Sequence, residues 1–132
     1  MEIGPIPKHG DDRGFLIEFL REDEKFLNFK GQIYASTIAP GTVRGNHFHE
    51  HKTEVFAVMK GKLRVLVQHI NGGEIKEYIL HGYDQNIERV VVEPNYAHTF
   101  INDGEEEVIL LAWGDQVHDH SGPDQYKHEI KI

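Results

Sequence analysis

The chain has 132 residues, of which 39% are hydrophobic and 27% charged, so it is long enough for one domain with a buried core and too short for two. Its formal net charge of −8 argues against a nucleic-acid binder, whose affinity depends on basic contacts to phosphate. No apolar run approaches the roughly 18 residues of a membrane span, and the absence of cysteine favours a cytoplasmic protein in a reducing environment.

Short apolar runs separated by turn-forming residues follow one another along the chain. The first ten residues, with Gly4, Pro5 and Pro7, predict a surface segment. Residues 21–30 predict a loop, because they show no sustained helical period. Strands are predicted wherever apolar or β-branched residues alternate with polar ones or form a short run. The predicted strands cover residues 15–20, 32–38, 54–59, 63–69, 75–80, 88–92, 97–101 and 107–113.

This spacing of strands and turns indicates the fold class. Many short strands joined by Gly- and Asn-containing turns, with almost no helix, predict an all-β sandwich or barrel. The polar tail, residues 114–132, is expected to form either an irregular flap or a final edge strand.

The segment from Gly41 to Gly61 contains an unusual group of polar residues. His47, His49 and His51 alternate along it, and Glu54 follows after a short polar break. In an extended segment, residues two apart point to the same side, so His47 and His49 would direct two imidazoles into one space. Imidazole and carboxylate are ligands that suit a first-row divalent metal such as zinc, iron, nickel or manganese. The segment therefore predicts a metal site.

The spacing within this segment resembles the first motif of the cupin superfamily. That motif has a glycine, His-x-His, a glutamate and a glycine, and here these places are filled by Gly41, His47, His49, Glu54 and Gly61.

The second cupin motif is matched in part, by His98 and Asn102. Asn95 stands at the usual turn glycine, and Glu93 and Ile87 replace the usual proline and opening glycine. Asn is the non-glycine residue that best tolerates a left-handed backbone, so the turn at Asn95 is expected to form.

The resemblance implies an all-β, single-domain cupin jelly-roll β-barrel over residues 1–132. Residues 1–30 would form an N-terminal strand and loop with a dimer contact, 31–113 the barrel and 114–132 the tail. It also implies a divalent metal, with Zn2+ expected and Fe2+, Ni2+ or Mn2+ as alternatives. The metal ligands implied are His47, His49, Glu54 and His98.

A narrower resemblance covers nearly the whole chain. The segments 12–15 (DRGF), 44–49 (RGNHFH), 52–54 (KTE) and 113–115 (WGD) are similar to those of sugar-nucleotide cupins. These cupins include dTDP-4-dehydrorhamnose 3,5-epimerase-like enzymes, keto-isomerases and the C-terminal cupin domain of capsular-polysaccharide UDP-sugar epimerase/reductases.

This resemblance implies an isomerase that epimerises or isomerises beside the keto group of a UDP- or dTDP-4-keto sugar in polysaccharide biosynthesis. Two alternatives stay open: an iron-type cupin dioxygenase, and a non-catalytic sugar-binding cupin that serves a separate reductase. A homodimer is expected, with the apolar run 15–20 as its contact.

The resemblance leaves the role of His47 open. In the 3,5-epimerases the corresponding histidine is the catalytic base, whereas in a metal-dependent enzyme His47 is a ligand and the base is Lys52, Tyr96 or a histidine beside the metal. Arg13 and Arg44 are expected to bind the substrate diphosphate, because guanidinium groups match phosphate oxygens. The remaining histidines are expected on the surface, where His118 and His120, two residues apart, could also bind a metal opportunistically.

Overall fold

The chain folds into two antiparallel sheets. The structure is a computed structural model that describes residues 2–24, 30–83 and 85–132. The alternating and β-branched runs of the sequence form strands within these ranges. The strands are β1 (Glu2–Asp11), β2 (Gly14–Ile17), β3 (Gln32–Ile38), β4 (Thr42–Phe48), β5 (Glu54–Lys60), β6 (Lys62–His69), β7 (Lys76–His81), β8 (Asn86–Val92), β9 (Tyr96–Asn102), β10 (Val108–Gly114) and β11 (Tyr126–Lys127). The predicted all-β class is confirmed, since the described residues contain no helix. In particular, none of them forms a helix long and apolar enough to cross a lipid bilayer.

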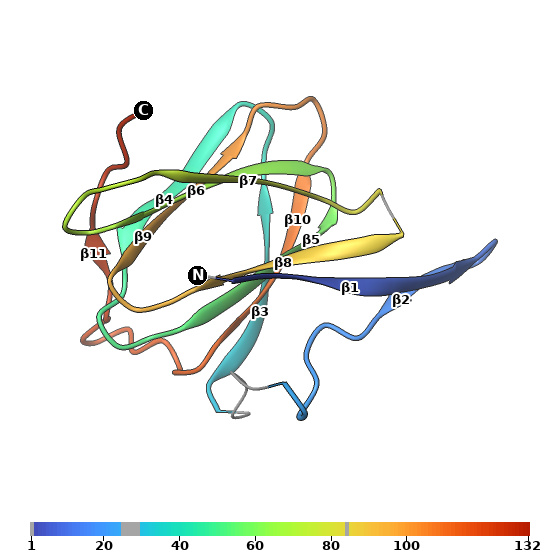
Figure 1. Cartoon of the computed structure of the whole chain (residues 1–132), viewed down its shortest axis with the longest axis horizontal. Helices are drawn as coiled ribbons and strands as arrows, with labels where there is room; N and C mark the ends of the chain where they lie inside the picture. Colours follow the sequence, from blue (N-terminus) through green and yellow to red (C-terminus); the bar gives the residue numbers. More distant parts are fainter. Residues whose placement is uncertain (1, 25–29, 84) are drawn as a thin grey trace.

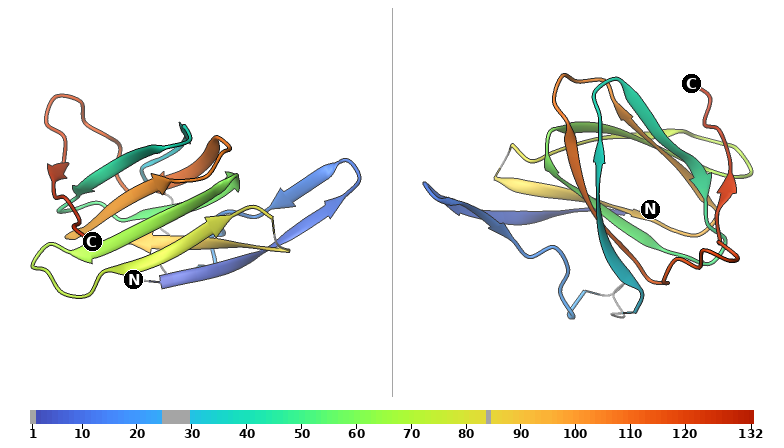
Figure 2. Two further views of the ribbon diagram at one scale, coloured as in Figure 1. Left: turned by 90° about the horizontal axis from the view of Figure 1, so that it is seen from above. Right: turned by 180° about the vertical axis from the view of Figure 1, so that it is seen from behind.

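The strand order of the two sheets determines where the polar groups can gather. The first sheet has the order β2-β1-β8-β5-β10-β3, and the second has the order β11-β4-β9-β6-β7 (Figure 1). Both sheets curl, and together they form a half-barrel (Figure 2). Residues 115–125 connect β10 of the first sheet with β11 of the second.

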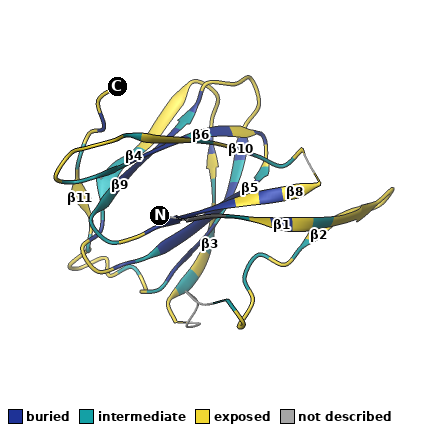
Figure 3. Ribbon diagram, viewed as in Figure 1, coloured by how far each residue is buried: buried dark blue, intermediate teal, exposed yellow. Residues whose placement is uncertain are grey.

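The core lies between the sheets, where side chains from both inner faces meet. Buried residues are concentrated in the strands and not in the outer loops (Figure 3). Phe56 and Val58 of β5 point into this core, while Val55 packs with Trp113 in a second cluster on the other face of the first sheet. Phe19 and Leu20 pack against this second cluster. Because β5 is covered on both faces, its sequence is a continuous apolar run and not an alternating one.

The N-terminal segment differs from its prediction. Residues 2–11 form a strand, although two prolines suggested an irregular surface segment. Residues 2–7 of β1 pair with β8, and residues 8–11 pair with β2, so the side of β1 away from β8 is unpaired around Pro5 and Pro7. Proline lacks an N–H and is tolerated on such an edge. The hairpin of β1 and β2 projects beyond the body of the molecule (Figure 2).

The other boundaries lie close to the predicted ones. The predicted strand 15–20 ends at Ile17, and the following residues cover the first sheet instead. The tail combines both predicted forms, because an irregular segment leads to the short edge strand β11 beside β4. Residues 25–29 of the predicted loop 21–30 lie outside the described residues, as does Asp84 in a predicted turn.

Candidate metal centre

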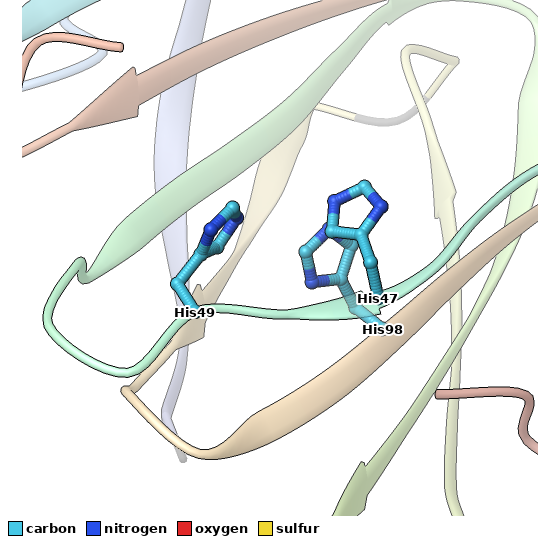
Figure 4. Close-up of side chains that lie close together, drawn as sticks. All are labelled: His47, His49 and His98. Carbon is cyan, nitrogen blue, oxygen red and sulfur yellow. The ribbon is translucent and has the colours of Figure 1, made fainter. Parts of the chain in front are cut away.

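Three histidine side chains converge near one end of the half-barrel. His47 lies in β4 directly opposite His98 of β9, and His49 follows the end of β4 (Figure 4). One ring nitrogen from each lies within 4.8 Å of the others. Glu54, the first residue of β5, places its carboxylate against His49. The four ligands implied by the cupin motifs therefore come together in the structure.

A bulge in β4 sets this arrangement. The pairing of β4 with β9 shifts between Gly45 and His47, so that His47 rather than Asn46 faces His98. Gly45 has a φ of 96°, and a Cβ there would lie 2.7 Å from the carbonyl oxygen of His98. Asn46 is also left-handed, with a φ of 56°, and its Oδ1 accepts a hydrogen bond from Thr99 Oγ1 at 2.6 Å. The Arg-Gly-Asn sequence before His47 therefore has a local structural function.

Hydrogen bonds fix the orientation of His49. Its Nδ1 donates to the backbone carbonyl of Asp124, which can only accept, so the proton of the neutral imidazole is on Nδ1 and its Nε2 has a free lone pair. This Nε2 lies 2.8 Å from Glu54 Oε1. Both atoms are buried without a hydrogen-bond partner among the described residues. Two acceptors at this distance repel each other unless a proton or a cation lies between them.

The second oxygen of Glu54 has a separate partner. Tyr34 donates its hydroxyl to Oε2 at 2.8 Å, which leaves Oε1 available. His98 directs its Nε2 towards the same oxygen, at 4.0 Å from Glu54 Oε1. Buried imidazole nitrogens beside an unpartnered carboxylate oxygen are the donor set of a divalent metal site. The residues therefore fit a metal ion.

The electrostatic environment favours the protonation states that metal ligands need. Burial alone would raise the pKa of Glu54, but the neighbouring His49 and His98 lower it to about 2. Burial lowers the pKa of His98 to about 3 and also lowers that of His47. For His49, the effect of burial is outweighed by the Glu54 carboxylate, which raises its pKa. At neutral pH, Glu54 is therefore ionised while His47 and His98 are neutral, as coordination requires.

A cavity of about 310 Å³ opens beside these groups. Lys52, which is only 9% exposed, lines it together with Tyr34 and the exposed Arg44. Among the described lining residues, Glu54 supplies the only carboxylate. The cavity is therefore positively charged although the whole chain is acidic. A larger cavity of about 880 Å³ lies elsewhere, between residues 17–23 and 30–33.

Two of the residues predicted for the site lie outside this cavity. Tyr96 is two residues before His98 in β9, but it packs against His69 and lines a different cavity. Arg13 lies in the β1–β2 hairpin, where its side chain is 90% exposed and pairs with Asp11 at 2.6 Å. The structure brings Lys52 and Arg44 to the proposed metal ligands, and it does not bring Tyr96 or Arg13 there.

Several residues of the site were not predicted from the sequence. The sequence predicts no contact with the ligands for Tyr34 or Asp124, and it predicts His118 and His120 as surface residues. No motif marks Tyr34 or Asp124, and both are distant in sequence from the ligands that they approach.

The sequence profile of the polysaccharide biosynthesis C-terminal domain family matches residues 9–126. The chain belongs to this family. It is 33% identical over 121 residues to UDP-2-acetamido-2,6-beta-L-arabino-hexul-4-ose reductase of Pseudomonas aeruginosa, and the aligned part covers 92% of this chain and 31% of the reductase. It is also 25% identical over 130 residues to the spore coat polysaccharide biosynthesis protein SpsL of Bacillus subtilis, covering 95% of this chain and 85% of SpsL.

Solved structures confirm the cupin jelly-roll fold. The capsular polysaccharide assembling protein CapF of Staphylococcus aureus superposes with a TM-score of 0.72 and 32% identity, over 96% of this chain and 35% of CapF. A dTDP sugar isomerase of Desulfovibrio desulfuricans superposes with a TM-score of 0.86 and 19% identity, over 97% of this chain and 83% of the isomerase, and this likeness shows the fold. The chain thus spans about a third of the length of the reductase and of CapF.

Proposed function

We propose that this protein is a metal-dependent sugar-nucleotide epimerase or isomerase that acts beside the keto group of a UDP- or dTDP-4-keto sugar in polysaccharide biosynthesis. The observation that carries the proposal is the facing pair of unpartnered atoms, His49 Nε2 and Glu54 Oε1, at the wall of a positively charged cavity. Zinc is the expected ion, held by these two residues with His47 and His98. The sugar-nucleotide enzymes and polysaccharide biosynthesis proteins among the relatives support the substrate class.

The roles of the chain's own residues follow from their positions. A divalent ion at this site would polarise a keto oxygen and stabilise the charge of an enolate. His47 is proposed as a ligand, because one of its ring nitrogens lies within 4.8 Å of those of His49 and His98. Lys52 is the proposed base for the proton on the carbon beside the keto group, since it lines the cavity and Tyr96 does not. Arg44 would bind the diphosphate.

Arg13 is proposed to act in a homodimer. The β1–β2 hairpin projects from the body, and its side chains Phe15 and Leu16 are 46% and 60% exposed. A second copy that covers these side chains would bring Arg13 to the cavity of the partner subunit. A separate reductase is the proposed functional partner, because one of the longer relatives is a reductase.

The test is proton exchange with solvent. Zinc-loaded protein is incubated in D2O with a panel of UDP- and dTDP-4-keto sugars, and NMR follows deuterium uptake at the carbon beside the keto group. We expect uptake by the wild type and loss of about a hundredfold or more in Lys52→Met, since general base catalysis contributes roughly 10²–10⁴-fold. Lys127→Met is the matched control, because this exposed lysine of β11 does not line the cavity.

Three other outcomes would contradict parts of the proposal. No uptake across the panel, with substrate still bound, would indicate a non-catalytic sugar-binding cupin. Oxygen consumption by iron-loaded protein would indicate a cupin dioxygenase, which can use the same ligands. Full activity of Lys52→Met would exclude this residue as the base.

A further inference from the structure

The segment between β10 and β11 forms one wall of the cavity. Four residues of this segment line it, together with Gly114 at the end of β10 and side chains from the two sheets; they are Gln116, His118, His120 and Gln125. His118 is half-buried and His120 is exposed, whereas the proposed ligands His49 and Glu54 are buried. The cavity therefore runs from the buried proposed ligands to an outer rim that contains His118 and His120.

Hydrogen bonds hold this wall in place at several points. The carboxylate of Asp124 accepts the backbone N–H of Glu50 at 2.8 Å and that of His51 at 2.9 Å. Nearer the start of the segment, Gln116 Nε2 donates to the carbonyl of His51 at 3.0 Å, and the N–H of His118 donates to Gln32 Oε1 at 2.9 Å. The wall is thus anchored both to the histidine segment and to edge strand β3.

The two tail histidines lie together at the rim. The ring centroids of His118 and His120 are 4.4 Å apart in an edge-to-face arrangement. Neither belongs to a group of three metal-ligating side chains at coordination distance among the described residues. Their ring N–H groups are hydrogen-bond donors. Arg44 lines the same cavity and uses one of its nitrogens on the carbonyl of Thr37 at 3.1 Å.

Size and charge indicate what such a rim would bind. A volume of about 310 Å³ is near the lower end of small-molecule sites. The sugar of a nucleotide sugar can enter a space of this size, while the linked diphosphate would lie at the mouth. Apart from Glu54, the described lining residues are neutral or cationic, which favours an anion there.

We propose that His118 and His120 bind the diphosphate of the nucleotide sugar at the mouth of the cavity, together with Arg44. This inference rests on the proposed function and gives the histidine-rich tail a role in substrate recognition. The pair contacts the non-reacting part of the substrate, so it contributes to affinity and not to the proton transfer.

The experiment measures binding of four probes to the zinc-loaded full chain by calorimetry: UDP, dTDP, inorganic pyrophosphate and uridine. The double variant His118→Gln/His120→Gln is compared with the wild type. His128→Gln is the matched control, because His128 belongs to the same tail but does not line the cavity. Loss of hydrogen bonds to a charged group is expected to raise the Kd of UDP at least about tenfold. Zinc content and the thermal midpoint should stay unchanged.

NMR of the histidine ring nitrogens in the wild type supplies a second measurement that does not depend on folding of the variant. Addition of UDP or pyrophosphate should shift the signals of His118 and His120, and uridine should not.

Three other results would contradict either the diphosphate-binding role of His118 and His120 or the proposed substrate class. Equal UDP binding by the wild type and the double variant overturns the role of the two histidines and leaves the proposed function standing. Absence of binding by the wild type to UDP, dTDP and pyrophosphate overturns the substrate class and the inference with it. A second equivalent of bound zinc that is lost in the double variant makes the pair a metal site and overturns the diphosphate assignment.

Discussion

At the scale of single residues, the proposed metal centre depends on groups that are not themselves ligands. Tyr34 occupies one oxygen of Glu54, and the carbonyl of Asp124 occupies one nitrogen of His49, so that each ligand has one free atom facing the other. Such outer partners fix the ligand orientation and the tautomer before an ion arrives.

The hydroxyl of Tyr34 is the simplest of these partners to remove. Tyr34→Phe leaves Glu54 Oε2 without its donor, so the carboxylate is free to rotate, and we expect the zinc Kd to rise about 10–100-fold. Competition with a chelating dye measures the Kd. Tyr126→Phe is the control, since Tyr126 is exposed in β11. A zinc affinity within twofold of the wild type in Tyr34→Phe would show that the hydroxyl does not orient the ligand.

Burial of a neutral His98 predicts how the stability of the metal-free protein depends on pH. Its folded-state pKa of about 3 lies below the usual 6.5, so the unfolded chain binds one more proton than the folded chain between these values. Stability is therefore complete above pH 6.5 and falls as the pH falls, by up to about 1.4 kcal/mol per pH unit for this group. The lowered pKa of His47 also makes the protein less stable as the pH falls. The raised pKa of His49 instead gives a stabilising contribution that is lost as the pH rises above 6.5.

Urea denaturation of chelator-treated protein between pH 4.5 and 6.5 measures this slope. Glu54 does not oppose it, because its lowered pKa also causes a loss of stability towards acid, and mainly below pH 4.5. His98→Gln should reduce the slope by about one proton. A slope that is unchanged in this variant would mean that His98 is not the group responsible.

At the scale of elements, the bulge in β4 brings residues of the two cupin-like motifs together in space, because it pairs His47 with His98. Gly45 permits both the left-handed backbone and the close approach to β9. The alternation of His47 and His49 predicted that both imidazoles enter one space, and this holds even though His49 lies just beyond the strand. The bulge itself has no reliable sequence signal.

Substitution of two glycines with similar φ angles separates the effect of the left-handed backbone from that of the close approach to β9. A Cβ at Gly45 (φ 96°) would collide with the carbonyl of His98, whereas at Gly72 (φ 95°) it would meet none of the described atoms within 4 Å. Gly72→Ala should lose only the roughly 1–2 kcal/mol of a left-handed alanine. Gly45→Ala should lose clearly more and also bind zinc more weakly. Thermal unfolding and zinc titration of both variants check this, and equal losses would argue against the collision.

At the scale of the whole molecule, the exposed apolar side chains of the β1–β2 hairpin predict a dimer. Multi-angle light scattering should give the mass of two chains, and Phe15→Ser/Leu16→Ser should shift it to one chain by removing the apolar contact. Ile132→Ser is the control, because Ile132 is also exposed but lies at the other end of the chain. A monomeric wild type would contradict the dimer.

Local pattern predicted most of the strands, because alternation and β-branched runs report which face a residue presents. It missed β1, since the two prolines are tolerated only because the side of β1 away from β8 is unpaired around them, and this pairing with a strand distant in the chain leaves no local pattern. The four proposed ligands were found from motif spacing. Tyr34, Asp124 and the two tail histidines were not found, because their roles depend on contacts with residues distant in the sequence.

The bond between His49 and Asp124 has a consequence for the order of events during synthesis. Translation delivers all four proposed ligands once residue 98 has left the ribosome, but the carbonyl that sets the tautomer of His49 arrives only with residue 124. A nascent chain of intermediate length therefore has every ligand and no fixed donor geometry. We therefore expect a divalent ion to be bound only after the tail, which also contributes β11 to the second sheet, is complete.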